Sequence, residues 1–297
     1  MSRCASRAVL SIGLWLLSGG AGAATSTPLL DYARTLSFDT PPGEQSDRRE
    51  LARASYEIAH DPPPREDCAR TLGARRFAGL LDELGAARAA LGDADGAVQA
   101  YQAALACTPR ALYLHAALAE ELLHAGRYSE ALASASRGLA IDRSDYRLGN
   151  ILGRLYFIEE RWPDASAWLR WSAASAAGPE QAMYWECFLW LAQRRAGVAR
   201  PQLSGRALTD SWPRPVLETL AGKLSEERLL AEVRREPSAH RRREILVEAL
   251  YYIGEMRLAD ADVDDARRYF AAAVNLKVLY FVEHHMALAE LAKLRNP

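Results

Sequence analysis

The chain has 297 residues, a formal net charge of −1 and 49% hydrophobic residues. This composition excludes a disordered chain, a disulfide-dense mini-protein and a multi-span membrane protein. Because the charge is so nearly balanced, we expect no nucleic-acid partner. Alanine makes up 55 of the residues, and Ala is the best helix former and a small packing residue. The sequence therefore predicts closely packed helices.

Residues 1–24 have the pattern of a secretory signal peptide. Arg3 and Arg7 precede an apolar stretch, and small residues follow up to Ala23 and Ala24. The apolar stretch is short for a membrane span, and no Cys stands at the cleavage point to accept a lipid. We expect an exported, periplasmic protein after cleavage. If the segment is not cleaved, it is an N-terminal membrane anchor.

Three cysteines follow the signal segment: Cys68, Cys107 and Cys187. In an oxidising compartment two of them can pair, and we expect Cys68 with Cys107 because they flank the first repeat described below. The third is expected to be a buried helix residue. No two of them have the C-x-x-C spacing of a redox or zinc site.

An N-terminal arm is predicted over residues 25–64. It contains two short helical segments, 29–36 and 46–60, which Pro-rich stretches separate from each other and from the rest of the chain. We expect the arm to lie on the body of the protein or on a second copy of the chain.

Residues 65–178 contain a repeat with a period of 34. Its most regular position is an alanine, found at Ala97, Ala131 and Ala165. A leucine lies thirteen residues before each alanine, at Leu84, Leu118 and Leu152. A small residue follows each leucine, at Gly85, Ala119 and Gly153. Stacked antiparallel helix pairs require small residues at fixed phases. The pattern resembles the tetratricopeptide repeat (TPR), and it predicts three such units here.

The segment 179–297 continues the pattern less regularly. We expect degenerate helical pairs over 180–245, with an N-cap at Ser225, and a further unit around Ala266. A closing helix with a polar outer face is expected over 281–294. The predicted fold class is thus all-α, a TPR-type helical solenoid of antiparallel helix pairs with a C-terminal capping helix.

The C-terminal half also resembles a specific family. The segment that begins at Trp212, the Gly-x-x-Ser-Glu step at 222–226, the Tyr-x-x-Gly at 251–254 and the Phe-Val-Glu-His at 281–284 are similar to NlpI-type proteins, which are periplasmic TPR lipoproteins of Gram-negative bacteria. The resemblance implies a dimeric adaptor that brings cell-wall hydrolases to a periplasmic protease. The sequence departs from the family because it lacks the lipid-acceptor Cys, so lipid anchoring is not carried over.

No compact catalytic motif occurs in the sequence, neither H-E-x-x-H, G-x-S-x-G, a P-loop nor G-x-G-x-x-G. We therefore expect no catalytic residue, no cofactor and no metal site. The leading hypothesis is a non-catalytic, exported protein-binding scaffold or adaptor in envelope maintenance or regulated proteolysis. A structural subunit of an envelope secretion or polysaccharide assembly is the alternative, and an enzyme with scattered site residues is a third.

A TPR solenoid offers a concave surface, which the first helix of each pair lines. Repeat phase predicts that a partner-binding groove on this surface contains Tyr113, Glu120, His124, Arg147, Asn150, Arg154, Tyr184 and Phe188. Arg147, Asn150 and Arg154 share one helical stripe. They fit either a clamp for a peptide backbone or terminal carboxylate, or a solvated charged face. Glu120 and His124 are expected to form an exposed i,i+4 pair.

Overall fold

A computed structural model of the chain describes residues 27–36, 44–60, 68, 73–204 and 209–295. The expected signal segment lies outside these residues. Within them the regular secondary structure is helical, which confirms the predicted fold class. The helices are α1 (Pro28–Thr35), α2 (Glu44–His60), α3 (Ala74–Ala90), α4 (Ala94–Cys107), α5 (Leu112–His124), α6 (Tyr128–Ile141), α7 (Tyr146–Ile158), α8 (Trp162–Ser175), α9 (Pro179–Arg195), α10 (Arg214–Leu220), α11 (Glu226–Arg235), α12 (Ala239–Ala259), α13 (Val263–Asn275) and α14 (Val282–Arg295). In the part of the chain so described, no helix combines the length and the apolar character that a bilayer span requires.

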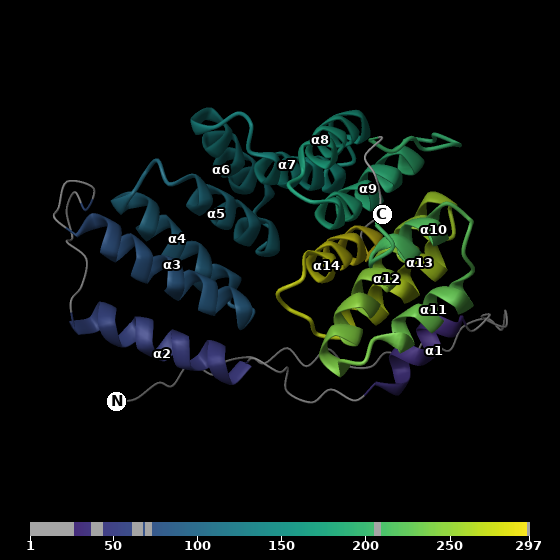
Figure 1. Cartoon of the computed structure of the whole chain (residues 1–297), viewed down its shortest axis with the longest axis horizontal. Helices are drawn as coiled ribbons and strands as arrows, with labels where there is room; N and C mark the ends of the chain where they lie inside the picture. The colour runs from purple at the N-terminus through teal and green to yellow at the C-terminus, as the bar shows by residue number, and fades with distance from the viewer. Residues whose placement is uncertain (1–26, 37–43, 61–67, 69–72, 205–208, 296–297) are drawn as a thin grey trace, which may run out of the picture.

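Successive helices pack as hairpins. The most extensive helix contacts are those of α3 with α4, α5 with α6, α7 with α8 and α12 with α13. Neighbouring hairpins stack through α4 on α5, α6 on α7 and α8 on α9, so the helices follow an arc (Figure 1). This arrangement is the TPR-type solenoid that the period of 34 predicts.

The repeated small residues lie where helices approach each other most closely. Ala97, Ala131 and Ala165 have no exposed surface. A Cβ atom added to Gly85 would lie only 2.6 Å from the ring of Tyr101, so the first helix pair can close only with glycine at this position. The predicted phases are therefore confirmed as packing positions.

The turn inside each of these hairpins contains a residue in the left-handed backbone conformation. Gly92, Gly126 and Glu160 follow each other at the repeat period and have φ values of 77°, 71° and 60°, and Ala261 has the same conformation with φ 62°. Glycine adopts this conformation without steric cost, whereas a side chain at the same position is strained. The third and the last hairpin therefore have the same turn geometry with Glu160 and Ala261 in place of glycine.

The stretch between α9 and α12 is less regular than expected. The predicted helices over 217–220 and 225–235 are present as α10 and α11, and Ser225 accepts a hydrogen bond from the backbone N–H of Arg228 at 3.4 Å, as an N-cap. These two short helices pack on each other and on α12, and α10 also contacts α9. The long helix α9 pairs with α8 and α12 instead, so the expectation of two degenerate pairs is only partly correct.

The N-terminal arm lies on the body of the protein. Helix α2 packs along α3 at the start of the arc, and α1 packs against α11, α12 and α13 at its far end (Figure 1). The Tyr269 hydroxyl donates a hydrogen bond to Thr27 Oγ1 at 2.8 Å, and the Arg234 guanidinium lies 4.8 Å from the centre of the Tyr32 ring. The arm thus connects the two ends of the solenoid.

Helix α14 turns inward. It packs on α13 and α12, as a closing helix should, but it also contacts α5 and α7 on the inner side of the arc. The expected polar outer face is wrong, because Glu283, His284 and Glu290 are buried. Glu283 accepts a hydrogen bond from the buried Tyr252 hydroxyl, and Glu290 pairs with Lys293.

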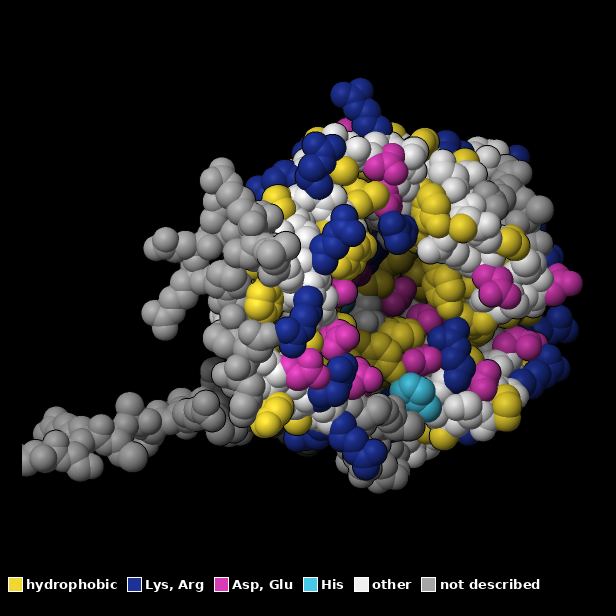
Figure 2. Space-filling model, turned by 60° about the vertical axis from the view of Figure 1, so that its left-hand side comes forward, with side chains coloured by type: hydrophobic (Ala, Val, Ile, Leu, Met, Phe, Trp, Pro, Cys, Tyr) yellow, Lys and Arg dark blue, Asp and Glu magenta, His cyan; other side chains and the backbone are white. Residues whose placement is uncertain are grey.

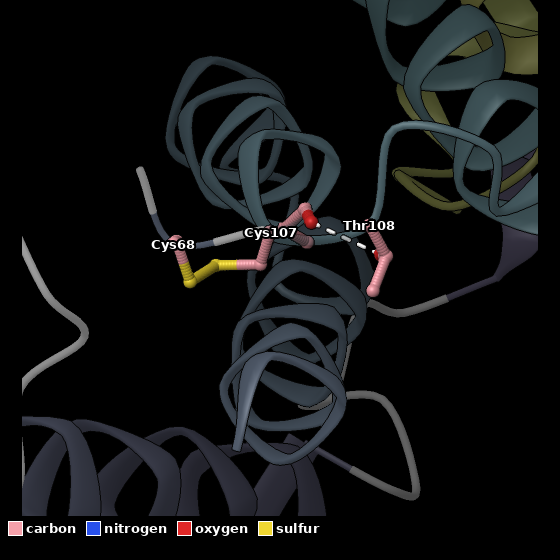
Figure 3. The surroundings of a disulfide bond; sticks show 4 residues. Cys68, Cys107 and Thr108 are labelled. Carbon is pink, nitrogen blue, oxygen red and sulfur yellow. Dashed lines mark hydrogen bonds between the residues drawn. A yellow bond between two sulfur atoms is a disulfide. The ribbon is translucent and has the colours of Figure 1, made fainter. Parts of the chain in front are cut away.

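A disulfide joins Cys68, which precedes α3, to Cys107, the last residue of α4 (Figure 3). Beside it, the Thr108 hydroxyl donates to the carbonyl oxygen of Ala104 at 3.1 Å and ends the helix. The third cysteine, Cys187, is fully buried in α9.

Candidate functional site

The inner side of the arc contains a cavity of about 350 Å³. Three helices of the solenoid, α5, α7 and α9, form one wall, and α12 with the start of α14 forms the other. Its lining combines charged and aromatic side chains: Glu120, Asn150, Arg154, Tyr184, Trp185, Phe188, Arg241, Glu248, Tyr280, Phe281 and Glu283. A neighbouring hollow of about 330 Å³ shares Glu120, Asn150, Arg154 and Trp185 with it. The face of the molecule in Figure 2 is hollowed, with hydrophobic and acidic side chains inside and Lys and Arg around the rim.

The structure brings most of the predicted groove residues together. Glu120, Asn150, Arg154, Tyr184 and Phe188 all line the cavity, and Arg147 lines the neighbouring hollow. Two predicted residues lie elsewhere. Tyr113 is 48% exposed and lines neither hollow, and His124 is buried one turn further along α5.

Arg154 is fixed by two residues of the cavity wall. Its Nη1 and Nη2 donate to the two carboxylate oxygens of Glu120 at 2.7 and 2.6 Å, and its Nε donates to Asn150 Oδ1 at 2.9 Å. Burial would raise the pKa of Glu120, but the charges of Arg154 and His124 and the hydrogen bonds from Arg154 outweigh it and hold that pKa well below its usual range. The ion pair is therefore formed at any physiological pH.

This geometry corrects the carboxylate-clamp hypothesis. Both guanidiniums are already paired within the chain, since Arg147 Nη2 lies 2.6 Å from Asp145 Oδ2 and Arg154 holds Glu120. A terminal carboxylate of a partner would have to displace these bonds. The stripe of Arg147, Asn150 and Arg154 is therefore not a clamp with two free cations.

Asn150 has an unused donor. Its residue is 5% exposed, its Oδ1 accepts from Arg154, and its Nδ2 has no hydrogen-bond partner among the described residues. A buried N–H group without a partner costs about 1–3 kcal/mol. Because Asn150 lines both hollows, an acceptor that a bound molecule supplies would remove this cost. A backbone carbonyl oxygen of a peptide is such an acceptor.

His124 is part of the same polar network and is not in an exposed pair, contrary to expectation. Its side chain is 6% exposed, with Nε2 3.5 Å from Glu120 Oε1 and Nδ1 3.2 Å from Glu121 Oε1. Burial would lower its pKa, but the neighbouring carboxylates of Glu120 and Glu121 raise that pKa to about 9. The ring stacks on His285 of α14, with centroids 4.1 Å apart. Burial and the charge of His124 lower the pKa of His285 to about 3.

Sequence reasoning missed the second wall of the cavity. Arg241 Nη2 donates to the Tyr184 hydroxyl at 3.0 Å, and Nη1 lies 3.1 Å from Glu244 Oε2 and 3.6 Å from Glu248 Oε1. Glu283 accepts from the Tyr252 hydroxyl at 3.0 Å. One signal was available: Glu248 interrupts an apolar run, ILVEALYYI. A carboxylate in the middle of such a run is seldom left without a buried partner.

The cavity can bind but shows no arrangement for metal chemistry. No group of three or more His, Cys, Asp or Glu side chains that could hold a metal ion occurs among the residues described. Its polar groups form ion pairs and hydrogen bonds, and its walls are aromatic. The arrangement suits recognition of a peptide segment or a similar ligand.

Comparison with known proteins gives little further information. No family model matches the sequence, and no curated protein matches it. Among solved structures the chain is similar to the crystal structure of YrrB, a TPR protein with an unusual peptide-binding site. The two share 14% identity over 80% of this chain and 97% of that one, with a TM-score of 0.36. The likeness is distant, and the assignment to a TPR-type solenoid rests on the repeat period and the helix pairs themselves.

Proposed function

We propose that the chain is a non-catalytic protein-binding scaffold that takes an extended segment of a partner protein into the cavity between α5, α7, α9 and α12. The observation that carries this proposal is the unpartnered amide of Asn150, which is buried in the wall of both hollows. A peptide backbone offers carbonyl acceptors at regular spacing, and the aromatic lining offers contact area for side chains.

An isosteric change tests the proposal. Asn150→Asp keeps an acceptor oxygen for Arg154 and replaces the unused donor with a second acceptor; it also adds one negative charge, which the control variant shares. We expect a library of displayed random peptides to enrich ligands on the wild-type protein, and the variant to bind those ligands about 10-fold or more weakly, as the loss of one buried hydrogen bond implies. Asn275→Asp, at the exposed end of α13, is the matched control. Equal binding by both variants, or no enrichment at all, contradicts the proposal.

We propose in addition that the protein works in the periplasm. The pattern of residues 1–24 supports export, and a disulfide between Cys68 and Cys107 is stable in an oxidising compartment. Cell fractionation followed by mass spectrometry of the N-terminus tests this. A mature chain in the periplasmic fraction that begins near Thr25 is expected, and an uncleaved chain in the membrane fraction would mean an anchored protein.

The resemblance of the C-terminal half to NlpI-type proteins supports a finer proposal: a homodimeric adaptor that joins a periplasmic protease to cell-wall hydrolases. Crosslinking in intact cells, followed by isolation of the protein, tests it. An adaptor gives several substoichiometric partners, among them a protease and a hydrolase. A single complex of fixed stoichiometry favours a structural subunit of an envelope assembly instead.

A further inference from the structure

The carboxylates of the cavity outnumber the cations that face them. Glu120 is neutralised by Arg154 through two hydrogen bonds. The one other guanidinium, that of Arg241, is shared between Glu244 and Glu248. Glu283 lines the same cavity and forms no ion pair within the described residues; its partner is the uncharged Tyr252 hydroxyl. The wall formed by α12 and α14 thus contains a carboxyl group, that of Glu283, for which the described residues provide no ion-pair partner.

Aromatic rings surround these carboxyl groups. Five of the residues that line the cavity are aromatic: Tyr184, Trp185, Phe188, Tyr280 and Phe281. Trp185 and Phe188 are 7% and 2% exposed, so their rings are held by packing. The face of an aromatic ring attracts a guanidinium or an ammonium group, and the interaction is strongest when water is excluded. Negative charge between aromatic walls is the environment that an organic cation prefers.

The two carboxyls furthest from a full countercharge lie in surroundings that favour their protonated forms. Burial raises the pKa of Glu248 and of Glu283. The charge of Glu283 raises the pKa of Glu248 further, and the charge of Glu120 raises that of Glu283, whereas Arg241 and Arg154 act in the opposite direction. Without a cation, the pair therefore tends to retain a proton. A cation that enters the cavity favours the ionised form of both groups, so its binding should release a proton into solution.

We propose that this cavity is a specificity pocket for a basic residue of the bound peptide: the guanidinium or ammonium group lies against Glu248 and Glu283 between the aromatic walls, and the amide of Asn150 binds the peptide backbone. The inference rests on the proposed function, because it names the side chain that the same groove selects. The binding step forms no covalent bond, and the displaced proton passes to the buffer.

The test compares synthetic nonapeptide pools that differ in one residue. The central residue is Arg, Lys, citrulline, norleucine or Glu, and the other eight positions are degenerate, with blocked ends. Citrulline has nearly the shape of arginine without its charge. We expect the wild-type protein to bind the Arg and Lys pools about 10-fold more tightly than the citrulline and norleucine pools, and the Glu pool most weakly. Calorimetry at pH 7 in two buffers of different ionisation enthalpy should show proton release with the Arg pool and none with the citrulline pool.

Variants then assign the preference to the cavity. Glu283→Gln should reduce the preference for Arg over citrulline to about 3-fold or less, and Glu130→Gln, on the exposed side of α6 and paired with Arg127, should leave it unchanged. The comparison of Arg with citrulline on the wild-type protein needs no variant, so it stands even if Glu283→Gln does not fold. Equal binding of all pools overturns the basic-residue pocket but leaves peptide binding intact. Binding of no pool at all overturns both.

Discussion

Glu120 and Arg154 occupy the same phase of consecutive repeats, 34 residues apart, and form a bidentate ion pair between α5 and α7. The repeat therefore places an acid in one unit directly beside a base in the next. The guanidinium is buried and also bonded to Asn150. This pair lies at the contact between two stacked hairpins and forms part of the cavity wall.

The first prediction concerns this pair. Glu120→Gln leaves the buried guanidinium without a countercharge, and we expect a loss of about 3 kcal/mol in the free energy of unfolding, measured with urea. Adding Arg154→Met should recover part of the loss, because the double variant has no unpaired charge. If the two single losses simply add in a double-mutant cycle, the pair is not coupled.

The second prediction concerns turn geometry. Ala261 has φ 62° and is exposed, so Ala261→Gly should remove the strain of a side chain in the left-handed region. We expect the free energy of unfolding to rise by about 1 kcal/mol. Gly126→Ala, at φ 71° in an equivalent turn, is the reciprocal variant and should lower it by a similar amount. No gain for Ala261→Gly, or no loss for Gly126→Ala, would contradict the assignment of these turns.

The third prediction is a pH dependence. Burial and the charge of His124 lower the pKa of His284 to about 4, from 6.5 in an unfolded chain. As the pH falls below 6.5 the unfolded state takes up the proton first, so this group lowers stability progressively until about pH 4. The contribution of His124 to stability changes with pH in the opposite direction. Its raised pKa contributes stability that is fully present below pH 6.5 and lost as the pH rises through about 9.

A comparison of variants isolates the contribution of His284. Between pH 7 and pH 5 the wild-type protein should lose about 2 kcal/mol more than His284→Leu in the free energy of unfolding. His284 is 4% exposed, so little screening by solvent is expected. The measurement is the urea midpoint of both proteins at several pH values, and parallel curves would refute the role assigned to this side chain.

The fourth prediction concerns the disulfide. The Cys68–Cys107 bond closes a loop with a sequence separation of 39 residues, and loop-closure entropy gives a stabilisation of about 3–4 kcal/mol. Cys107→Ser, or reduction of the wild-type protein, should lower the free energy of unfolding by that order. Alkylation and mass spectrometry report the state of the two thiols. Loss of the bond without any loss of stability would contradict this prediction.

The repeat positions were predictable because they depend on local geometry. Ala97 and its equivalents lie at helix contacts within one hairpin, and a period of 34 carries that information directly. The neighbourhood of Glu120, Asn150 and Arg154 was predictable for the same reason, since it involves only adjacent units. Their pairing was not, because it depends on side-chain rotamers.

The second wall of the cavity could not be predicted in this way. Glu283 and Arg241 reach the residues of α7 and α9 only because the solenoid curves through several units. The curvature is the sum of small rotations between neighbours, and no spacing in the sequence records it. The inward turn of α14 has the same origin, and so does the burial of His124 against His285.

The position of α14 also fixes the number of units. An open solenoid can stretch along its axis, and a unit can be added or removed with little effect on the others. Here the last helix reaches back to α5 and α7, while α1 crosses to α11 and α13. An inserted 34-residue unit would move α14 away from His124 and widen the opening. The contacts of α14 with α5 and α7 therefore set the width of the opening of the arc.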